Sequence, residues 1–287
     1  MTQETITCFD NRGTYAEVRV KSEDSLTTRT RAIWTSGDLL PIARSYAAGA
    51  EEFIMRLGIH RSETVLDVAC GTGNLAIPAA KTGARVYGVD IAPYVIAQAR
   101  LEARAEGARV DFNVGNAESL LFADRLFDTT VSMFGAMFSA RPEVTASELV
   151  RVTREGGRVA MANWTPSGFA GQFFRVHSSV SPLPPDMRNP LDWGQEEQVR
   201  ALFGDSVSSM TFARRTIDLR FPMPPSAVSR LFASCYGPTV TVLEKLDTVD
   251  VKKFRDEMSR LFHLHNRATD GTTIVSAEYL QVLARVA

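Results

Sequence analysis

The feature that most restricts the fold of this chain is an alternation of short apolar runs with longer amphipathic segments between residues 64 and 164. The apolar runs are rich in β-branched residues, and most of the amphipathic segments end at a glycine. Such an alternation predicts βαβ units, and therefore a doubly wound α/β fold with helices on both faces of a largely parallel sheet. The expected strands are Thr64–Ala69, Arg85–Val89, Arg109–Val114, Phe127–Met133 and Arg158–Trp164, and the expected helices are Leu75–Lys81, Pro93–Ala105 and Ala146–Arg154.

The segments on either side follow other patterns. Residues 4–20 predict a hairpin, because two strand-like runs flank turn residues at 10–14, and residues 28–58 have helical periodicity. Residues 165–200 are rich in proline, glycine and aromatic residues and predict an irregular cap. Further on, the patterns predict a strand at Thr216–Phe221 and helices within 226–268, and they leave 272–286 open between strand and helix. The expected parts are a hairpin and helical lid (1–58), a core (59–165), and a cap with the remaining core strands and helices (166–287).

Three strand ends carry residues that suit a nucleoside. Thr64–Ala69 runs into a glycine-rich turn, where Gly71 and Gly73 allow the backbone to approach a ligand. The second strand ends before Asp90, and a carboxylate at that place accepts hydrogen bonds from both ribose hydroxyls. Asn116 follows the third strand, where a polar side chain can read the edge of adenine. These ends predict a nucleoside site at the carboxyl edge of the sheet.

With these motifs, residues 60–165 resemble the class I S-adenosylmethionine (SAM)-dependent methyltransferases, in particular the ubiquinone/menaquinone C-methyltransferase-like group. Upstream, Trp34–Asp38 is similar to a segment that closes over SAM in that group. The resemblance implies a Rossmann-like seven-stranded sheet with a cap inserted after strand five, and methyl transfer from SAM to a small molecule, with S-adenosylhomocysteine as product. The matching motifs are Leu66–Gly73, Asp90, Gly115–Glu118, Phe127–Asp128, Ser132–Phe134 and Arg154–Gly157.

The resemblance also implies which residues hold SAM. Two positions depart from the usual motifs: Asn116 stands where the group usually has Asp, and Glu155 where it has Pro. Asn116 keeps an acceptor for the adenine amino group and adds a donor, whereas Glu155 alters a turn. The implied SAM-binding residues are Trp34, Gly37, Asp67, Ala69, Gly71, Thr72, Gly73, Asn74, Asp90, Ile91, Asn116, Ala117, Glu118 and Phe134.

Two alternatives concern the same turn. The spacing Gly71-x-Gly73-x-x-Ala76 also fits a loose dinucleotide fingerprint, so an NAD-dependent oxidoreductase is one alternative. Asp67 argues against it, because a carboxylate repels the pyrophosphate that sits at such a turn and attracts the cationic amino acid end of SAM. A SAM-binding protein that transfers no methyl group is the second alternative, and nothing in the sequence excludes it.

Composition bears on partners and location. The formal net charge of -1 gives no electrostatic field that would attract nucleic acid or an anionic membrane. Amino-methylating enzymes of nucleic acids resemble one another in an Asn/Asp-Pro-Pro-aromatic motif after strand four, and this chain has Ser132–Gly135 at that place instead. The N-terminus lacks a signal-peptide pattern, and no apolar run approaches a membrane span. Three widely spaced cysteines indicate neither disulfides nor a metal site. We therefore expect a cytoplasmic protein with no metal and no nucleic-acid or membrane partner.

The sequence indicates the methyl acceptor site less clearly than the SAM site. In-line displacement needs alignment, a dry cavity and, for a protonated nucleophile, a base. His177 is the first choice for a base because it falls in the aromatic cap, although a satisfied structural histidine is the more usual reading. His263 and His265 lie at i, i+2, on different helix faces, so a shared metal site is not expected. The residues expected to line an apolar or aromatic acceptor pocket, each equally able to be ordinary core, are Met137, Phe138, Trp164, Phe169, Phe173, Trp193 and Tyr236.

The acceptor and the assembly follow as broader expectations. An aromatic pocket suits a quinone-like molecule or a specialised metabolite, which is also what the resemblance implies for biosynthesis. The N-terminal hairpin predicts a homodimer, because an isolated hairpin is marginal and prefers to pair or pack.

Overall fold

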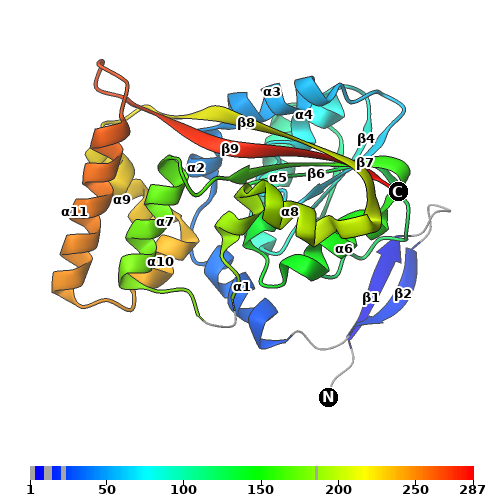
Figure 1. The fold of residues 1–287 in the computed structure, drawn as a ribbon, viewed down its shortest axis with the longest axis horizontal. Helices are drawn as coiled ribbons and strands as arrows, with labels where there is room; N and C mark the ends of the chain where they lie inside the picture. The colour runs from blue at the N-terminus through cyan, green and yellow to red at the C-terminus, as the bar shows by residue number, and fades with distance from the viewer. Residues whose placement is uncertain (1–3, 10–14, 21–23, 185–186) are drawn as a thin grey trace.

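The computed structural model describes residues 4–9, 15–20, 24–184 and 187–287, and its centre is a seven-stranded sheet (Figure 1). The strand order is β5-β4-β3-β6-β7-β9-β8, with parallel pairing from β5 to β7 and antiparallel pairing of β9 with both neighbours. The predicted seven-stranded α/β sheet is confirmed. Its strands are β3 (Thr64–Val68), β4 (Arg85–Asp90), β5 (Val110–Val114), β6 (Phe127–Met133), β7 (Thr153–Trp164), β8 (Val207–Phe221) and β9 (Thr273–Val286).

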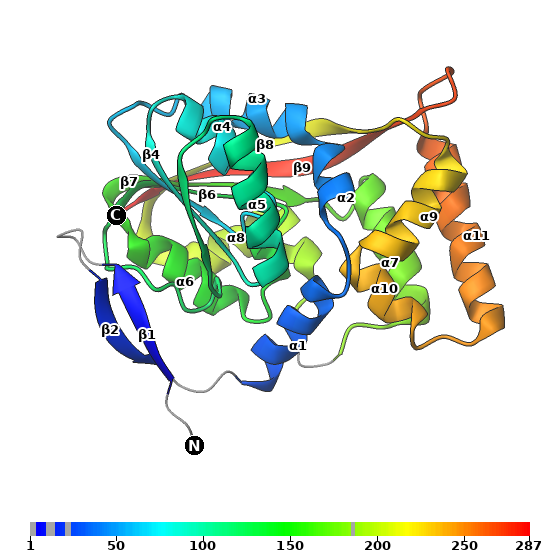
Figure 2. The ribbon, with the colours of Figure 1, turned by 180° about the vertical axis from the view of Figure 1, so that it is seen from behind.

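Helices cover both faces of the sheet (Figures 1 and 2). Successive residues of a strand point to opposite faces, so Val65 packs into the core beneath α3, α4 and α5, and Leu66 packs into the core beneath α6 and α8. The near-continuous apolar run of β3 is the pattern that a strand buried on both faces requires. The helices are α3 (Ala47–Leu57), α4 (Ala76–Lys81), α5 (Pro93–Ala105), α6 (Pro142–Val152) and α8 (Glu196–Phe203).

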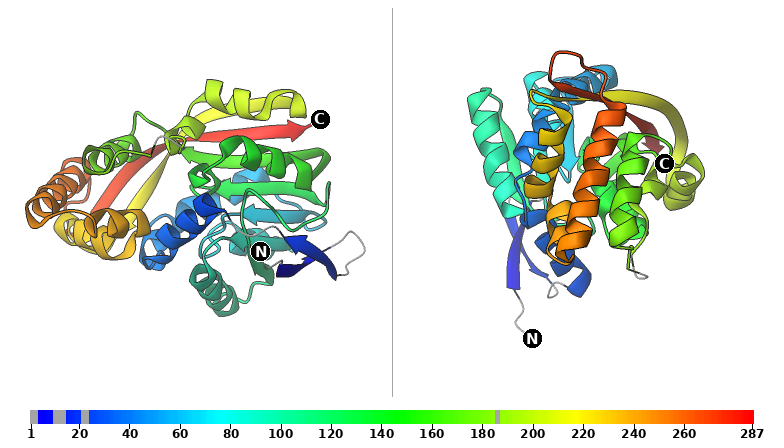
Figure 3. Two further views of the ribbon diagram at one scale, coloured as in Figure 1. Left: turned by 90° about the horizontal axis from the view of Figure 1, so that it is seen from below. Right: turned by 90° about the vertical axis from the view of Figure 1, so that its left-hand side faces the viewer.

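A second group of helices lies at one end of the long strands β8 and β9 (Figures 1 and 3). It comprises α7 (Phe169–Val180), α9 (Pro225–Cys235), α10 (Gly237–Leu243) and α11 (Thr248–His265). From the other end of the chain, α1 (Ser25–Thr35) packs against α10, where the Gly237 Cα lies close to the Ile33 carbonyl. Segments about 200 residues apart thus border the carboxyl edge of the sheet.

Several element boundaries differ from the sequence prediction. The segment 28–58 is not one helix, because α1 ends at Thr35 and the chain turns at Gly37 before α2 (Leu40–Arg44) and α3. The cap after Trp164 is not irregular throughout: Phe169, Phe173 and His177 are buried on one face of α7, a periodicity that the many prolines and glycines obscured. The undecided tail is the strand β9.

The N-terminal hairpin has the predicted strands. β1 (Glu4–Phe9) pairs antiparallel with β2 (Tyr15–Val20), from Glu4 opposite Val20 to Phe9 opposite Tyr15. The predicted turn at 10–14 lies outside the described residues. Within the described parts of the chain, none of the helices has the length and apolar character required to cross a bilayer.

Candidate functional site

The site lies where the order of the strands reverses. β4 pairs on one side of β3 and β6 on the other, so the carboxyl ends of β3 and β6 border a crevice. After β3 the chain turns through Ala69 and Gly71, both with a left-handed φ of 54°. Gly135, just after β6, lies against this turn, and a Cβ there would be 2.5 Å from the Ala69 carbonyl oxygen. The close backbones form one wall of the cavity.

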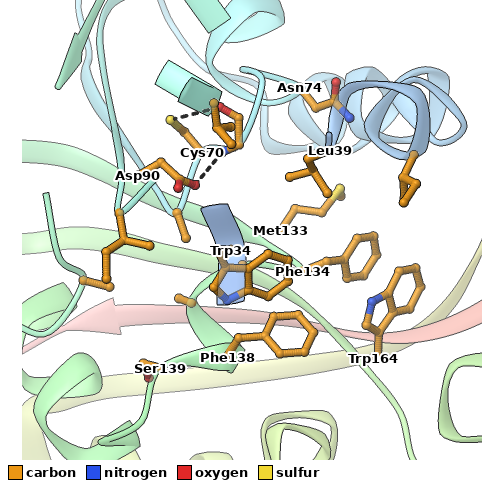
Figure 4. A pocket seen from close by; sticks show the side chains of 18 of the residues that line it. Trp34, Leu39, Cys70, Asn74, Asp90, Met133, Phe134, Phe138, Ser139 and Trp164 are labelled. Carbon is orange, nitrogen blue, oxygen red and sulfur yellow. Dashed lines mark hydrogen bonds between the residues drawn. The ribbon is translucent and has the colours of Figure 1, made fainter. Parts of the chain in front are cut away.

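Two carboxylates are fixed at the strand ends. Asp90 accepts a hydrogen bond from the Gly71 N–H at 3.0 Å (Figure 4) and another from the Ala92 N–H at 2.9 Å. It therefore joins the end of β4 to the turn after β3. Asp67 accepts from the Ala76 N–H at 3.0 Å, at the start of α4. Both side chains line the cavity.

Burial disfavours the charged form of both carboxylates. It raises the pKa of Asp67 well above its usual value, and the nearby Asp90 charge raises the Asp67 pKa further. Burial likewise raises the pKa of Asp90, against the hydrogen bonds that stabilise its charge. No cationic side chain is among the described residues that line the cavity. A cationic ligand would lower both pKa values and would be attracted to this end of the cavity.

The corner beyond Asp90 is built from the loop after β5. The Asn116 side-chain oxygen accepts from the Glu118 N–H at 3.0 Å, and its amide donates to the Thr27 hydroxyl of α1 at 3.2 Å. The Glu118 carboxylate, with a side chain only 5% exposed, accepts from Arg141 Nε at 2.6 Å. Arg141 also pairs with Asp24, the N-cap of α1, at 2.7 Å. One arginine thus links this corner to the helix that covers it.

Aromatic rings form the opposite end of the cavity (Figure 4). Phe134 stacks on Trp164 with ring centroids 3.4 Å apart and an interplanar angle of 5°. Trp34 of α1 meets Phe138 edge-on at 5.1 Å and Tyr236 at 5.8 Å. The cavity is therefore acidic and polar at one end and aromatic at the other.

Comparison with known proteins agrees with this geometry. A family model described as a methyltransferase domain matches residues 66–161. Uncharacterized protein Rv1405c of Mycobacterium tuberculosis is 35% identical over 232 residues, which are 77% of this chain and 81% of that protein. Demethylmenaquinone methyltransferase of Thermus thermophilus is 38% identical over 117 residues, 39% of this chain and 53% of that protein. The YcgJ protein of Bacillus subtilis has a similar fold, with a TM-score of 0.56 at 16% identity over 83% of this chain and 98% of that one.

This chain is a class I SAM-dependent methyltransferase. The resemblance drawn from its motifs is therefore confirmed, and the alternative of an NAD-dependent oxidoreductase is set aside. Most of the predicted site residues of the methyltransferase meet in the one cavity. Those that line it are Trp34, Asp67, Ala69, Gly71, Asn74, Asp90, Ile91, Asn116, Ala117, Glu118 and Phe134 from the cofactor set, and Phe138, Trp164, Phe169, Phe173 and Tyr236 from the acceptor set.

Five other predicted residues of the methyltransferase lie outside the cavity lining. Gly37 packs against backbone instead, since a Cβ there would be 2.1 Å from the Cys235 carbonyl oxygen. Thr72 is buried in the turn, and Gly73 faces Ile77 and Phe112 in the core behind it. Met137 and Trp193 are buried in the core beneath α6 and α8, where Trp193 meets Phe203 edge-on.

His177 is the clearest correction, because it does not reach the cavity of the methyltransferase. Its Nδ1–H donates to the Phe173 carbonyl at 2.9 Å, and its Nε2 accepts from the Thr239 hydroxyl at 2.7 Å. The side chain is 8% exposed, and burial lowers the pKa of His177 from 6.5 to about 4. A neutral imidazole with both nitrogens engaged holds α7 to α10 and is not placed to act as a base.

Sequence reasoning missed several lining residues of the methyltransferase. On the N-terminal segment, the missed residues are Thr27 and Thr30, which lie seven and four residues before the predicted Trp34, and Leu39, Ile42 and Tyr46, which have i, i+3, i+7 spacing. That spacing on one helical face is a signal that could have found them. Others come from distant elements and carry no local signal, such as Leu219 on β8, Phe232 on α9 and Ala277 on β9.

Proposed function

We propose that this methyltransferase binds SAM in the cavity at the strand reversal and methylates a small, uncharged, aromatic or apolar acceptor. The observation that carries the proposal is the division of one cavity into an acidic end and an aromatic end. The match to a methyltransferase domain supports the donor, and the aromatic wall supports the acceptor.

The residues present fit SAM. Asp67 is buried and Asp90 is half-buried, and neither carboxylate has a cationic partner in the described lining, which suits the cationic amino acid end and the ribose of the donor. Asn116 retains one amide hydrogen, beyond its bond to Thr27, with which to meet adenine. SAM supplies an electrophilic methyl group. The chain binds the donor, orients the acceptor and excludes water with the rings of Trp34, Phe138 and Phe173.

Asp90→Asn tests the donor site. The substitution keeps one acceptor oxygen for the turn but removes the charge. We expect SAM affinity, measured by calorimetric titration, to fall about 10- to 100-fold, the cost of losing charged hydrogen bonds. Asp111→Asn, at an exposed carboxylate on the neighbouring β5, should leave affinity unchanged. Absence of SAM binding by the wild type, or equal binding by both variants, would refute the site.

Transfer of label from methyl-labelled SAM distinguishes an active methyltransferase from a protein that binds SAM without transferring its methyl group. The homodimer and the cytoplasmic location remain proposals, supported by the hairpin pairing and by the sequence respectively. A sedimentation run that gives a monomer at micromolar concentration would contradict the dimer.

A further inference from the structure

The hydroxyl of Tyr236, in the aromatic half of the cavity, has no hydrogen-bond partner in the part of the chain that the structure describes. Tyr236 follows the last turn of α9, lines the cavity and is 8% exposed. Among the described residues, none forms a hydrogen bond with its hydroxyl. Burial raises the pKa of Tyr236, so the phenol stays protonated and can donate. Buried hydroxyls normally find a partner, and a ligand in the cavity would provide one.

The ring of Tyr236 is held from several sides. Trp34, Phe173 and Phe232 contact it at centroid distances of 5.8, 5.7 and 5.6 Å. These contacts leave little freedom of orientation, so the hydroxyl is a pre-positioned donor. Among the described residues, the indole N–H groups of Trp34 and Trp164 and the Ser139 hydroxyl line the same cavity and also form no hydrogen bond with the protein. Tyr236 is therefore one free donor at this end of the cavity, and the rings around it hold it in place.

The surrounding wall restricts what the donor can meet. It is formed by rings and aliphatic side chains, including Phe138, Trp164, Phe169 and Leu219, and no ionisable acid or base of the described chain lines it. A ligand with a charge away from the reacting oxygen would lose its hydration here without compensation. A planar, uncharged ring with an oxygen that accepts from Tyr236 matches both the apolar wall and this donor.

We propose, resting on the methyltransferase function above, that Tyr236 recognises the methyl acceptor by donating a hydrogen bond to its oxygen, and that the acceptor is a planar aromatic alcohol. The same oxygen is the nucleophile. The alcohol loses its proton to solvent water outside the cavity, an oxygen lone pair forms a bond to the methyl carbon of SAM, and the carbon–sulfur bond breaks with its electron pair on sulfur. The products are a methyl ether and neutral S-adenosylhomocysteine.

The described residues offer no base for this proton near Tyr236. The ionisable groups in the cavity lining, besides the two tyrosines, are Asp67, Asp90, Cys70 and Glu118, all from the strand ends that form the polar end. His177 lies beside Tyr236 at 6.4 Å between centroids, but Phe173 and Thr239 occupy its nitrogens. The acidity of the acceptor itself must therefore set the pH at which it reacts.

Equilibrium dialysis of 1-naphthol and naphthalene against the complex with S-adenosylhomocysteine tests the recognition. Tyr236→Phe keeps the ring contacts and removes the hydroxyl, so 1-naphthol should bind it about 5- to 10-fold more weakly than wild type, whereas naphthalene should bind both equally. Tyr279→Phe is the matched control, because Arg56 holds that hydroxyl outside the cavity lining. It should bind 1-naphthol like the wild type.

Two outcomes would overturn the proposal: 1-naphthol that fails to bind the wild type, and 1-naphthol that binds wild type and Tyr236→Phe equally. Either result with intact SAM binding rejects the acceptor assignment and leaves the methyltransferase site in place. Loss of SAM binding by the wild type would instead refute the proposed function.

The pH profile of methyl transfer checks the origin of the proton. The rate should rise with pH in step with ionisation of the acceptor, at lower pH for 4-nitro-1-naphthol than for the less acidic 1-naphthol. The coloured nitronaphtholate loses its absorbance on methylation, which gives a direct assay. A single midpoint shared by both acceptors would show a base in the protein and contradict the proposal.

Discussion

The buried, neutral state of His177 has a measurable consequence for stability. The unfolded chain takes up a proton on this imidazole below its usual pKa of 6.5, whereas the folded protein does so only near pH 4. Stability contributed by the neutral imidazole is therefore complete above the unfolded pKa and is lost as the pH falls through this window. The full loss is about 3 kcal/mol, and the part between pH 7 and pH 5 is about 2 kcal/mol.

Urea denaturation at pH 7 and pH 5 measures this loss. The variant His177→Gln removes the titrating group, so its free energy of unfolding should fall by about 2 kcal/mol less than that of the wild type between the two pH values. The comparison between pH values separates this effect from the lower stability of the variant at both. His263→Gln, at an exposed histidine of α11, is the matched control and should lose stability like the wild type. If wild type and His177→Gln lose the same stability, His177 is open to solvent, and the reasoning that removes it from the catalytic site is wrong.

Two further predictions concern α1, the helix over the cavity. Gly37→Ala would place a Cβ 2.1 Å from the Cys235 carbonyl oxygen, so we expect the free energy of unfolding in urea to fall by about 1–3 kcal/mol. An unchanged midpoint of urea denaturation would mean that the turn after α1 does not pack against the end of α9. Arg141→Gln would remove the cation that pairs with the Glu118 carboxylate and with Asp24. Because the Arg141 side chain is 40% exposed, solvent screening limits the loss of interaction free energy to about 1 kcal/mol. Calorimetric titration should therefore show roughly fivefold weaker SAM binding. Equal affinity of Arg141→Gln and wild type would show that this arginine does not couple the loop after β5 to α1.

The local parts of the site followed from the sequence alone. A β-branched run, a glycine-rich turn and a helix are contiguous, so residues 64–81 specify their own geometry, and Asp67 and Gly71 occur where the pattern placed them. The same holds for the ends of β4 and β5, which carry Asp90 and Asn116. In a parallel sheet all these ends meet at one edge, which is why a linear pattern predicted a three-dimensional site.

The orientation of the cap helices could not be predicted in this way. His177 lies on the same face of α7 as Phe169 and Phe173, which line the cavity, but it is one turn further along the helix and packs against Thr239 and Phe254. Which turns of a helix border a cavity depends on the elements that pack against it, and no local pattern of residues indicates this. Met137 and Trp193 were misassigned for the same reason, since apolar side chains serve either face of the sheet equally well.

Sequence alone thus determined the class of fold, the order of its central elements and the acidic end of the cavity, because those features depend on short-range pattern and on the shared edge of a parallel sheet. Only the tertiary structure decided the aromatic end. There Trp34 of α1, Leu219 of β8 and Tyr236 after α9 meet across about 200 residues of chain, and their meeting depends on how whole helices and strands pack, which no local run of residues encodes.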